Sequence, residues 1–268
     1  MNKKIMINDE YSIEQVHDKL LILLSEFDRI CRKNKIRYIL DSGTLIGAVR
    51  HNGFIPWDDD ADVAMLRKDY KKFIKACKRD LNHDLFTLDT IHTSKNSILN
   101  FGKLKLNNTI WVERGNENIN IHQGVYIDIF PLDNAFNWTW YLQFKFANFW
   151  KEVRWVKMGR SCEYHRIAHK IFGKILPLKL INFNAELTMR MFNIFPSKKT
   201  SKISSPKRGR PPHSKKFYTD IIEHPFRNKL FFIPKDYDEM LTILYGDWRK
   251  LPPKEEQKPE HNIIKIKL

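Results

Sequence analysis

The chain has 268 residues, of which 42% are hydrophobic and 13% aromatic, so it can bury a sizeable core and is not a disordered polypeptide. Three cysteines exclude a disulfide scaffold, and 47 Lys and Arg residues against 31 Asp and Glu residues give a net charge of +16. Residues 1–136 carry 20 basic and 19 acidic side chains, so the remaining excess of +15 lies in residues 137–268 and attracts anions there.

The N-terminal segment and the hydropathy pattern bear on where the protein works. Residues 1–12 contain two lysines but no apolar core of a secretory signal. No stretch approaches the roughly 18 uninterrupted apolar residues of a helix that crosses a bilayer. We therefore expect a cytoplasmic protein that binds peripherally to the inner face of the cytoplasmic membrane, whose anionic lipids attract the basic half.

Helix and strand patterns alternate over the first half of the chain. Ser12 and Gln15 have the spacing of a capping box, and apolar residues then recur at helical period as far as Cys31. A second helix is predicted over 69–81. Strands are predicted where β-branched and aromatic residues cluster, at 37–40, 61–65, 85–88, 99–104, 109–113 and 125–130. This mixture predicts an α+β (or α/β) fold, with a mixed β-sheet core and flanking helices in residues 1–134.

Helical patterns dominate residues 135–268. Helices are predicted at 138–155, 166–176, 184–195 and 236–245, the last of them ended by Gly246. Eight aromatic residues interleaved with Lys and Arg make 138–155 either a core helix or a helix that lies in a bilayer interface. Residues 197–216 hold eight basic residues, three prolines and no acid, which predicts a basic linker. We expect this mainly helical, basic region to form the acceptor site or a membrane-binding surface.

An acidic cluster at the start of one predicted strand is the most informative feature. Asp58, Asp59, Asp60 and Asp62 fall within five residues, and such a cluster is destabilising unless a cation neutralises it. Because side chains alternate along a strand, Asp60 and Asp62 share one face. Two carboxylates on one face make an oxygen-rich site suited to Mg²⁺ or Mn²⁺. The alternative is a solvated acidic turn.

A second element lies upstream, where Ser42-Gly43-Thr44 follows a predicted strand and opens a short helix. Glycine permits a close approach of the backbone, and the N–H groups at a helix start attract phosphate. Arg50 and His51 close the same short helix and are candidate phosphate ligands. The alternative is an ordinary helix cap followed by two surface residues.

These elements together resemble the nucleotidyltransferase fold of the polymerase-β type. In that fold a glycine and a hydroxyl residue precede two metal carboxylates, and a third carboxylate comes from a later strand. Asp128 is the candidate third carboxylate, because it lies among apolar strand residues, where a buried carboxylate needs a partner. The alternative role for Asp128 is to cap the turn into Pro131.

Four blocks of the sequence resemble one family more closely. They are 37–65 (RYILDSGTLIGAVRHNGFIPWDDDADVAM), 101–113 (FGKLKLNNTIWVE), 124–133 (GVYIDIFPLD) and 234–253 (PKDYDEMLTILYGDWRKLPP). In this order they look like the LicD family, bacterial phosphocholine transferases that decorate cell-surface glycans. Fukutin and fukutin-related protein are animal relatives. Residues 134–233 carry no part of the resemblance.

The resemblance implies a metal-dependent phosphotransferase whose donor is CDP-choline. A sugar hydroxyl of a lipid-linked glycan, of the lipopolysaccharide or teichoic acid type, would attack the choline-bearing phosphorus, and CMP would leave. Asp60, Asp62 and Asp128 match the carboxylates that hold Mg²⁺ or Mn²⁺ in the family. Asp128 is also the candidate to accept the proton of the hydroxyl, because the metal occupies Asp60 and Asp62.

The resemblance also assigns the residues around the donor phosphates. Gly43, Thr44 and Arg50 match positions expected there, with His51 beside them. Lys103 matches a lysine element of the family and is suited to neutralise phosphate charge. Phosphoryl transfer depends mainly on positioning and on this neutralisation, so the assigned residue types agree with the chemistry.

A choline group requires a further element, because a quaternary ammonium offers no hydrogen bond and is recognised by aromatic faces. Trp57, Trp111 and Tyr126 are candidates, together with the tryptophans of the second half. The sequence does not choose among them.

Three alternatives stay open. The same core suits a nucleotidyltransferase that moves NMP and releases pyrophosphate, and it suits transfer of ribitol phosphate or glycerol phosphate from the CDP-activated donor. Residues 206–212 (PKRGRPP) resemble an AT-hook, whose Arg-Gly-Arg core inserts into narrow minor grooves. A basic linker reproduces that pattern without binding DNA, and we do not expect nucleic acid to be a partner.

Overall fold

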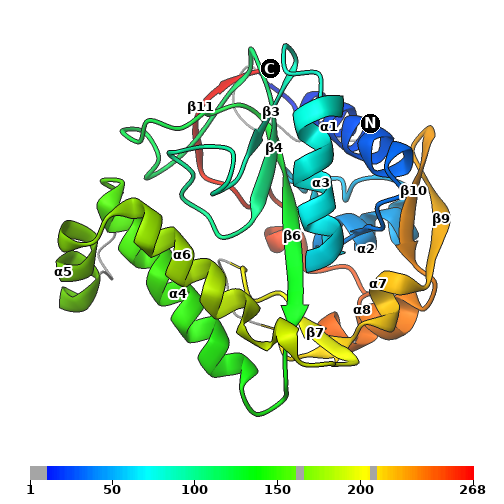
Figure 1. The fold of residues 1–268 in the computed structure, drawn as a ribbon. Coiled ribbons are helices and arrows are strands. Elements are labelled where there is room, and N and C mark those ends of the chain that lie inside the picture. The colour runs from blue at the N-terminus through cyan, green and yellow to red at the C-terminus, as the bar shows by residue number, and fades with distance from the viewer. Residues whose placement is uncertain (1–10, 161–165, 206–209) are drawn as a thin grey trace.

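The computed structural model describes residues 11–160, 166–205 and 210–268, which form a mixed β-sheet with flanking helices (Figure 1). The predicted α+β fold is confirmed. The elements, in chain order, are α1 (Ile13–Lys33), β1 (Ile39–Leu40), α2 (Ser42–His51), β2 (Asp62–Leu66), α3 (Arg67–Asp80), β3 (Phe86–Asp89), β4 (Gly102–Leu106), β5 (Ile110–Glu113), β6 (Tyr126–Asn134), α4 (Trp140–Lys157), α5 (Ile167–Ile175), α6 (Leu178–Arg190), η1 (Met191–Ile194), β7 (Lys199–Ser201), β8 (His213–Ser214), α7 (Lys216–Thr219), β9 (Ile221–Phe226), β10 (Lys229–Pro234), α8 (Tyr237–Tyr245), η2 (Lys254–Glu256) and β11 (Ile263–Lys267).

The central sheet is built around the long strand β6. Its strand order is β1-β2-β6-β4-β3, and β7 and β8 extend it from the far end of β6. Strands β2 and β6 run parallel, whereas the pairs β1–β2, β6–β4 and β4–β3 are antiparallel. Strand β6 therefore has neighbours from the early, middle and late parts of the chain.

Helices α1 and α3 pack on the sheet and lie beside β6 in Figure 1. The capping box predicted at the start of α1 is present between Ser12 and Gln15. Leu20, Leu24 and Phe27 follow on one side of the helix and are at most 1% exposed. Burial of each such side chain contributes about 1.5–3 kcal/mol, so this stripe fixes α1 on the sheet.

Residues 197–216, expected to be a linker, contribute to the sheet instead. Their first part forms β7, in which Ser201 pairs with Asp133 of β6. The hydroxyl of Thr200 donates to the carbonyl of Asp133 at 2.7 Å, and Thr200 and Ile203 are at most 1% exposed. The segment packs because its small and apolar side chains face inward, a pattern that its many charges obscure in the sequence. Residues 206–209 lie outside the described part.

Three further strands were not predicted. β9 and β10 form an antiparallel hairpin, and β11 pairs with β5. Phe226, Phe231 and Ile233 of the hairpin are buried in the same core as α1 and the central sheet. The core of the first half is therefore completed by side chains that follow residue 216.

Helices α4, α5 and α6 form a layer beside the sheet (Figure 1). The sequence left α4 open as a core or an interfacial helix, and in the structure it packs against both α5 and α6. Arg154 of α4 is fully buried; its Nε donates to Asn182 at 2.7 Å and its Nη1 to the Leu99 carbonyl at 2.9 Å. This side chain ties α4 to α6 and to the loop before β4. In the described residues, no helix is long and apolar enough to cross a membrane.

His17 connects α1 to the loop that precedes β2. Its Nε2 donates to the Asp58 carbonyl at 2.7 Å, and its ring stacks on Phe54 with the centroids 4.5 Å apart. Burial lowers the pKa of His17 from 6.5 to about 4. The folded protein therefore holds this imidazole neutral.

We predict that His17 makes folding stability depend on pH. The pKa of His17 is about 4 in the folded protein and 6.5 in the unfolded chain. Its contribution to the free energy of unfolding is therefore complete above about pH 6.5 and is lost as the pH falls toward about 4. The free energy of unfolding of the wild type should fall by about 3 kcal/mol more than that of His17→Gln between neutral pH and about pH 4. Urea unfolding at a series of pH values measures both, and equal pH slopes would contradict the assignment.

Candidate active site

The register of the central sheet places three charged side chains in a row. Asp62 on β2 is the direct partner of Asp128 on β6, and Asp128 is the direct partner of Lys103 on β4. Neighbouring strands lie about 4.8 Å apart, and partner residues project from the same face. The Lys103 Nζ lies 3.3 Å from the Asp128 Oδ1. Two carboxylates and an ammonium group thus stand side by side.

Apolar residues on the opposite face hold this register. Val63, Leu104 and Ile127 alternate with the charged residues along the three strands and are fully buried. A slip of one residue in any strand would turn its apolar side chains toward the charged row and its charged side chain into the core. The packing of the core therefore determines the geometry of the site.

The loop before β2 adds two more carboxylates, those of Asp58 and Asp60. Both line the same pocket as Asp62 and Asp128. A Cβ atom on Gly43 would lie 2.5 Å from the Asp58 Oδ2. Glycine at the start of α2 is therefore what leaves room for the Asp58 carboxylate.

The clustered carboxylates resist ionisation. Burial raises the pKa values of Asp58 and Asp62 well above their usual range, and the charge of Asp60 adds to both shifts. Burial also raises the pKa values of Asp60 and Asp128, although Lys103 opposes the shift of Asp128. The Asp128 Oδ1 is buried and accepts no hydrogen bond, even with the Lys103 ammonium beside it. The cluster carries more negative charge than its neighbours neutralise.

The C-terminal segment completes one wall of the site through Asp59. This carboxylate accepts hydrogen bonds from the backbone N–H groups of Glu260 and His261, each at 3.2 Å, and pairs with the His261 Nδ1 at 2.9 Å. Burial opposes protonation of His261, but the bond to Asp59 and the charge of Asp60 raise its pKa to about 9. A charged imidazole thus lies 4.0 Å, Nε2 to Oδ2, from Asp60.

The basic segment after β7 contributes Lys202 and Arg210. The Lys202 ammonium pairs with Asp41 and donates to the Ser42 hydroxyl at 3.1 Å. The Arg210 guanidinium carbon lies 4.7 Å from the centroid of the Tyr245 ring. Burial alone would raise the pKa of Asp41, but Lys202 and Arg210 lower it. Both cations are therefore held in place by groups at the edge of the acidic cluster.

These side chains line a cavity of about 640 Å³, which we term the acidic pocket. It is lined by Ser42, Gly43, Asp58, Asp60, Asp62, Asp128, Phe130, Lys202, Ser205, Arg210, Tyr245, Glu260 and His261. A second cavity of about 260 Å³, the aromatic pocket, shares Asp128 and His261 with it. Phe101, Trp111, Tyr126 and Trp155 are among the aromatic side chains that line this second cavity. The two pockets are thus neighbours on one face of the sheet.

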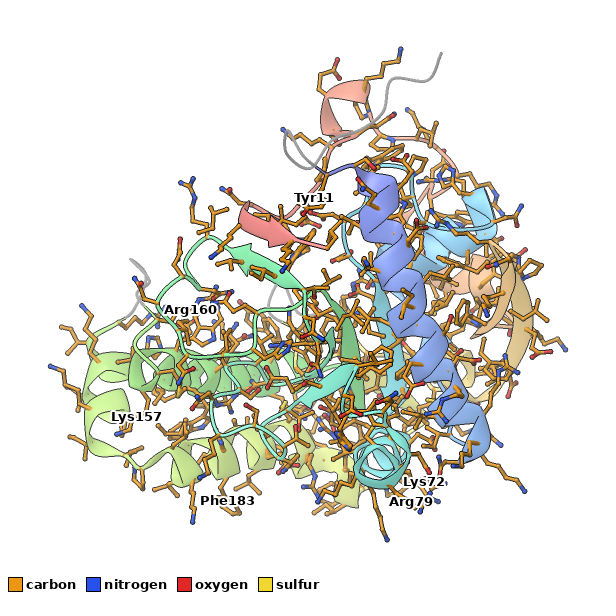
Figure 2. The ribbon with its side chains drawn as sticks, turned by 90° about the horizontal axis from the view of Figure 1, so that it is seen from above. Tyr11, Lys72, Arg79, Lys157, Arg160 and Phe183 are labelled. Atoms are coloured by element: carbon orange, nitrogen blue, oxygen red, sulfur yellow. The ribbon has the colours of Figure 1, made fainter. Side chains whose placement is uncertain are left out.

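Lys103 and Tyr126 line the aromatic pocket next to Asp128, which both pockets share. The Lys103 Nζ lies 3.1 Å from the centroid of the Tyr126 ring, and the Tyr126 hydroxyl donates to Glu113 at 2.5 Å. Arg160, beyond the end of α4, also lines the aromatic pocket, and Figure 2 shows it between α4 and β5. The helical layer therefore contributes directly to this cavity.

Three residues predicted near the donor phosphates, Thr44, Arg50 and His51, do not line the acidic pocket. Thr44 is buried, and its hydroxyl accepts a hydrogen bond from the Asp62 backbone N–H at 2.8 Å, so it anchors the start of β2. Arg50 donates to the Trp248 carbonyl at 2.9 Å and to His51 at 3.0 Å. A helical rise of 1.5 Å per residue separates Arg50 from Gly43 by about 10 Å along α2, which explains why Arg50 and His51 do not line the acidic pocket.

The acidic pocket offers carboxylate oxygens, the donor type that Mg²⁺ and similar divalent cations prefer. Among the residues that the structure describes, no three carboxylate, imidazole or thiol side chains converge as a ready-made metal centre. Mg²⁺ in phosphoryl-transfer sites is usually held by one or two carboxylates together with water and substrate phosphate. Burial raises the pKa values of Asp60 and Asp62, and the Asp128 Oδ1 accepts no hydrogen bond although the Lys103 ammonium lies beside it, so these oxygens are suited to a cation.

The site thus combines expected and unexpected residues. Gly43, Asp60, Asp62, Asp128 and Lys103 were predicted from the sequence, and the structure brings them together. Lys202, Arg210 and His261 were not predicted. Only the positive charge of the segment around Lys202 and Arg210 hinted at a role with anions, and no local pattern marks His261.

Comparison with known proteins identifies relatives of the chain. Residues 35–184 match the family model described as LicD/FKTN/FKRP, nucleotidyltransferase domain. The lipopolysaccharide cholinephosphotransferase LicD of Haemophilus influenzae is 28% identical over 259 residues, which cover 90% of this chain and 92% of that protein. The matched regions contain the strands and loop that carry the acidic cluster.

Two shorter matches are to uncharacterized proteins of Rickettsia prowazekii and Rickettsia typhi. Each is 47% identical over 47 residues, or 18% of this chain. The matched stretch spans 18% of the first protein and 15% of the second. These matches show local similarity only.

We predict that Asp62→Asn stabilises the metal-free protein. The change removes one of several mutually repelling carboxylates and keeps the size of the side chain, so the free energy of unfolding should rise by about 1 kcal/mol. The control is Asp84→Asn, an exposed aspartate in the turn before β3, which should change stability by less than about 0.5 kcal/mol. Thermal unfolding in the presence of a chelator measures both, and a destabilised Asp62→Asn would contradict the electrostatic account.

Proposed function

The chain belongs to the LicD family, and from this premise we propose that it is a transferase that moves phosphocholine from CDP-choline to a sugar hydroxyl of a cell-surface glycan, with release of CMP. The observation that carries the proposal is the acidic pocket, in which Asp60, Asp62 and Asp128 lie together with the cations Lys202 and Arg210. The similarity to the Haemophilus influenzae lipopolysaccharide cholinephosphotransferase supports the group transferred and an acceptor of the lipopolysaccharide type.

We propose Mg²⁺ or Mn²⁺ as the cofactor, held by Asp60 and Asp62 with Asp128 beside them. Bound there, the cation would neutralise charge on the phosphate oxygens of the donor. The protein's own contribution is the spacing of the carboxylates, which the register of β2 on β6 fixes. The apolar face behind them keeps that spacing rigid.

Lys202 and Arg210 are suited to hold the diphosphate of the donor. Both come from the segment after β7, far along the chain from the carboxylates. A contact orients each of them: Asp41 orients Lys202 and Tyr245 orients Arg210. Because both groups are already in place, little reorganisation free energy is needed when negative charge develops on the phosphate oxygens. Lys103 provides a third cation on the other side of Asp128.

Transfer then requires one bond to form and one to break. The acceptor hydroxyl oxygen bonds to the phosphorus that bears choline, the bond from that phosphorus to the oxygen of CMP breaks, and CMP leaves with that oxygen. The hydroxyl proton passes to a carboxylate of the pocket, for which we propose Asp128, because its Oδ1 accepts no hydrogen bond from the protein. The Lys103 ammonium at 3.3 Å orients that carboxylate.

The aromatic pocket is the candidate place for the choline group. It adjoins the acidic pocket at Asp128 and brings Trp111, Tyr126 and Trp155 together with the carboxylate of Glu113. Aromatic faces with a nearby carboxylate attract a quaternary ammonium. Because Lys103 already lies on the Tyr126 ring and Arg160 on the Trp155 ring, we propose Trp111 as the face that receives it. Trp57, another candidate from the sequence, instead lies against His51 outside both pockets.

The main alternatives keep this site and change the donor. NMP transfer with release of pyrophosphate, and transfer of ribitol phosphate or glycerol phosphate, would use the same carboxylates. The DNA-binding alternative loses its clearest residue, since Arg210 of the Arg-Gly-Arg pattern lines the acidic pocket and donates to the Tyr245 hydroxyl at 2.5 Å.

We predict that the purified protein with Mg²⁺ and a lipopolysaccharide acceptor releases CMP from CDP-choline and releases no pyrophosphate from NTPs. Asp60→Asn and Asp62→Asn should each lower turnover by at least about a thousandfold, because each removes a carboxylate proposed to hold the metal. Chromatography of the released nucleotide identifies the reaction. Turnover within about tenfold of wild type in either variant refutes the metal assignment, and activity on CDP-ribitol or CDP-glycerol alone refutes the choline assignment.

We also predict that Arg210 recognises phosphate charge. Arg210→Gln should weaken binding of CDP about tenfold or more while leaving binding of cytidine unchanged, because the guanidinium would pair with phosphate oxygens. Lys198→Gln, an exposed lysine of the same segment, is the matched control and should bind CDP like the wild type.

For Lys202, the double variant Lys202→Met with Asp41→Asn removes both members of the buried pair and should show the same selective loss. Titration calorimetry with the two ligands decides, and equal losses for cytidine and CDP would indicate a purely structural role.

A further inference from the structure

The helical layer carries an unusual concentration of exposed apolar side chains. Of the 22 large apolar side chains that are exposed in the described residues, fourteen lie between residues 138 and 195. On α5 they recur at 167, 171 and 175, and on α6 and η1 at 180, 183, 187, 191 and 194. These intervals of three and four residues place each set along one side of its helix. The eight side chains, here termed the apolar helical surface, are between 41% and 80% exposed.

The opposite side of each helix is the one that packs, so the exposed side is fixed by the fold. Ile181, Ala185 and Met189 of α6 are fully buried. On α5, a Cβ added to Gly173 would lie 2.8 Å from a methyl carbon of Val156 on α4, which shows how closely α5 and α4 approach. Figure 2 shows Phe183 at the outer edge of the layer, away from the sheet. The buried sides of α5 and α6 already pack within the chain, and the apolar helical surface is the side that they leave exposed.

Basic side chains flank this surface, whereas acidic ones are engaged. Arg166, Lys170, Lys174 and Lys179 are exposed on and between α5 and α6. The two acidic residues in the described part of 138–195 are partly buried: Glu152 pairs with His169 at 3.2 Å, and Glu186 with Arg190 at 3.0 Å. The surface thus presents apolar stripes bordered by positive charge.

We propose that α5, α6 and η1 form a membrane-docking surface, which inserts its apolar stripes into the interface of an anionic bilayer while the flanking lysines contact lipid headgroups. Helices with apolar residues on one side and Lys or Arg beside them bind such interfaces. Charge complementarity favours an anionic bilayer over a second copy of the chain as the partner of this surface, because two copies would bring the same positive charges together. This inference uses a surface different from the site used for phosphocholine transfer, and it does not depend on that function.

The proposed surface also has a suitable position relative to the pockets. Trp155 and Arg160, from the end of α4 and the residues after it, line the aromatic pocket, and α4 packs directly on α5 and α6. Docking through α5 and α6 would therefore hold the pockets near the bilayer, where a lipid-linked molecule could reach them. The sequence left α4 open as a core helix or an interfacial helix; the exposed apolar side chains of α5 and α6 favour those two helices for the interfacial role.

The test is sedimentation of the full-length protein with lipid vesicles, one set of phosphatidylcholine alone and one of equal parts phosphatidylcholine and phosphatidylglycerol. We expect binding to the mixed vesicles that weakens as salt is added. The double variant Phe183→Asn with Leu187→Asn should bind at least about tenfold more weakly, because it removes two large side chains from the bilayer interface. Both residues are exposed, so the unfolding midpoint of the variant should match that of the wild type.

Matched controls distinguish this surface from exposed apolar residues in general. Leu230→Asn with Ile243→Asn changes two equally exposed residues on β10 and α8 and should leave vesicle binding unchanged. Lys170→Glu with Lys174→Glu should weaken binding to the mixed vesicles more than to phosphatidylcholine alone. The proposal is overturned if the wild type binds neither kind of vesicle, or if Phe183→Asn with Leu187→Asn binds like the wild type. It is also overturned if those two changes abolish a concentration-dependent dimer and leave vesicle binding intact.

Discussion

The pairing of β2 with β6 is the constraint on which the site depends. Because the two strands run parallel in a fixed register, Asp62 and Asp128 lie side by side although they are 66 positions apart in the sequence. The buried residues that alternate with them hold this register, and their burial stabilises a strained arrangement in which like charges are close. The fold thus maintains a cluster of negative charge that a cation and a phosphate-bearing substrate together would complement.

The rest of the site is assembled from distant parts of the chain around that pair. β4 adds Lys103, the segment after β7 adds Lys202 and Arg210, and the segment before β11 adds His261. Each of these four is held by a carboxylate or a ring: Lys103 by Asp128, Lys202 by Asp41, Arg210 by Tyr245 and His261 by Asp59. The aspartates of the acidic pocket therefore come from the first half of the chain, and most of the cations come from the second half.

Much of this could be predicted from the sequence, and the limits have physical causes. The helices with one apolar side, such as α1 and α3, and the strand that carries Asp62 have strong periodic patterns, so their positions agree with the prediction to within a few residues. Strand β7 is short, β11 alternates isoleucine with lysine, and β9 contains a proline, so local pattern alone did not mark them as strands. The positions of Lys202 and His261 depend on tertiary contacts that no local pattern encodes. The family resemblance assigned Thr44 and Arg50 to the donor phosphates. In the structure the Thr44 hydroxyl accepts a hydrogen bond from the backbone of β2, and Arg50 lies at the far end of α2, where it donates to the Trp248 carbonyl.

The central claim is that the carboxylates of the acidic pocket bind a divalent cation jointly with a diphosphate. Titration calorimetry of Mg²⁺ into the protein, with and without CDP, tests it most directly. The account predicts a binding event that CDP strengthens and that is absent in Asp128→Asn with Asp62→Asn. No uptake of Mg²⁺ or Mn²⁺ by the wild type in the presence of CDP would contradict it.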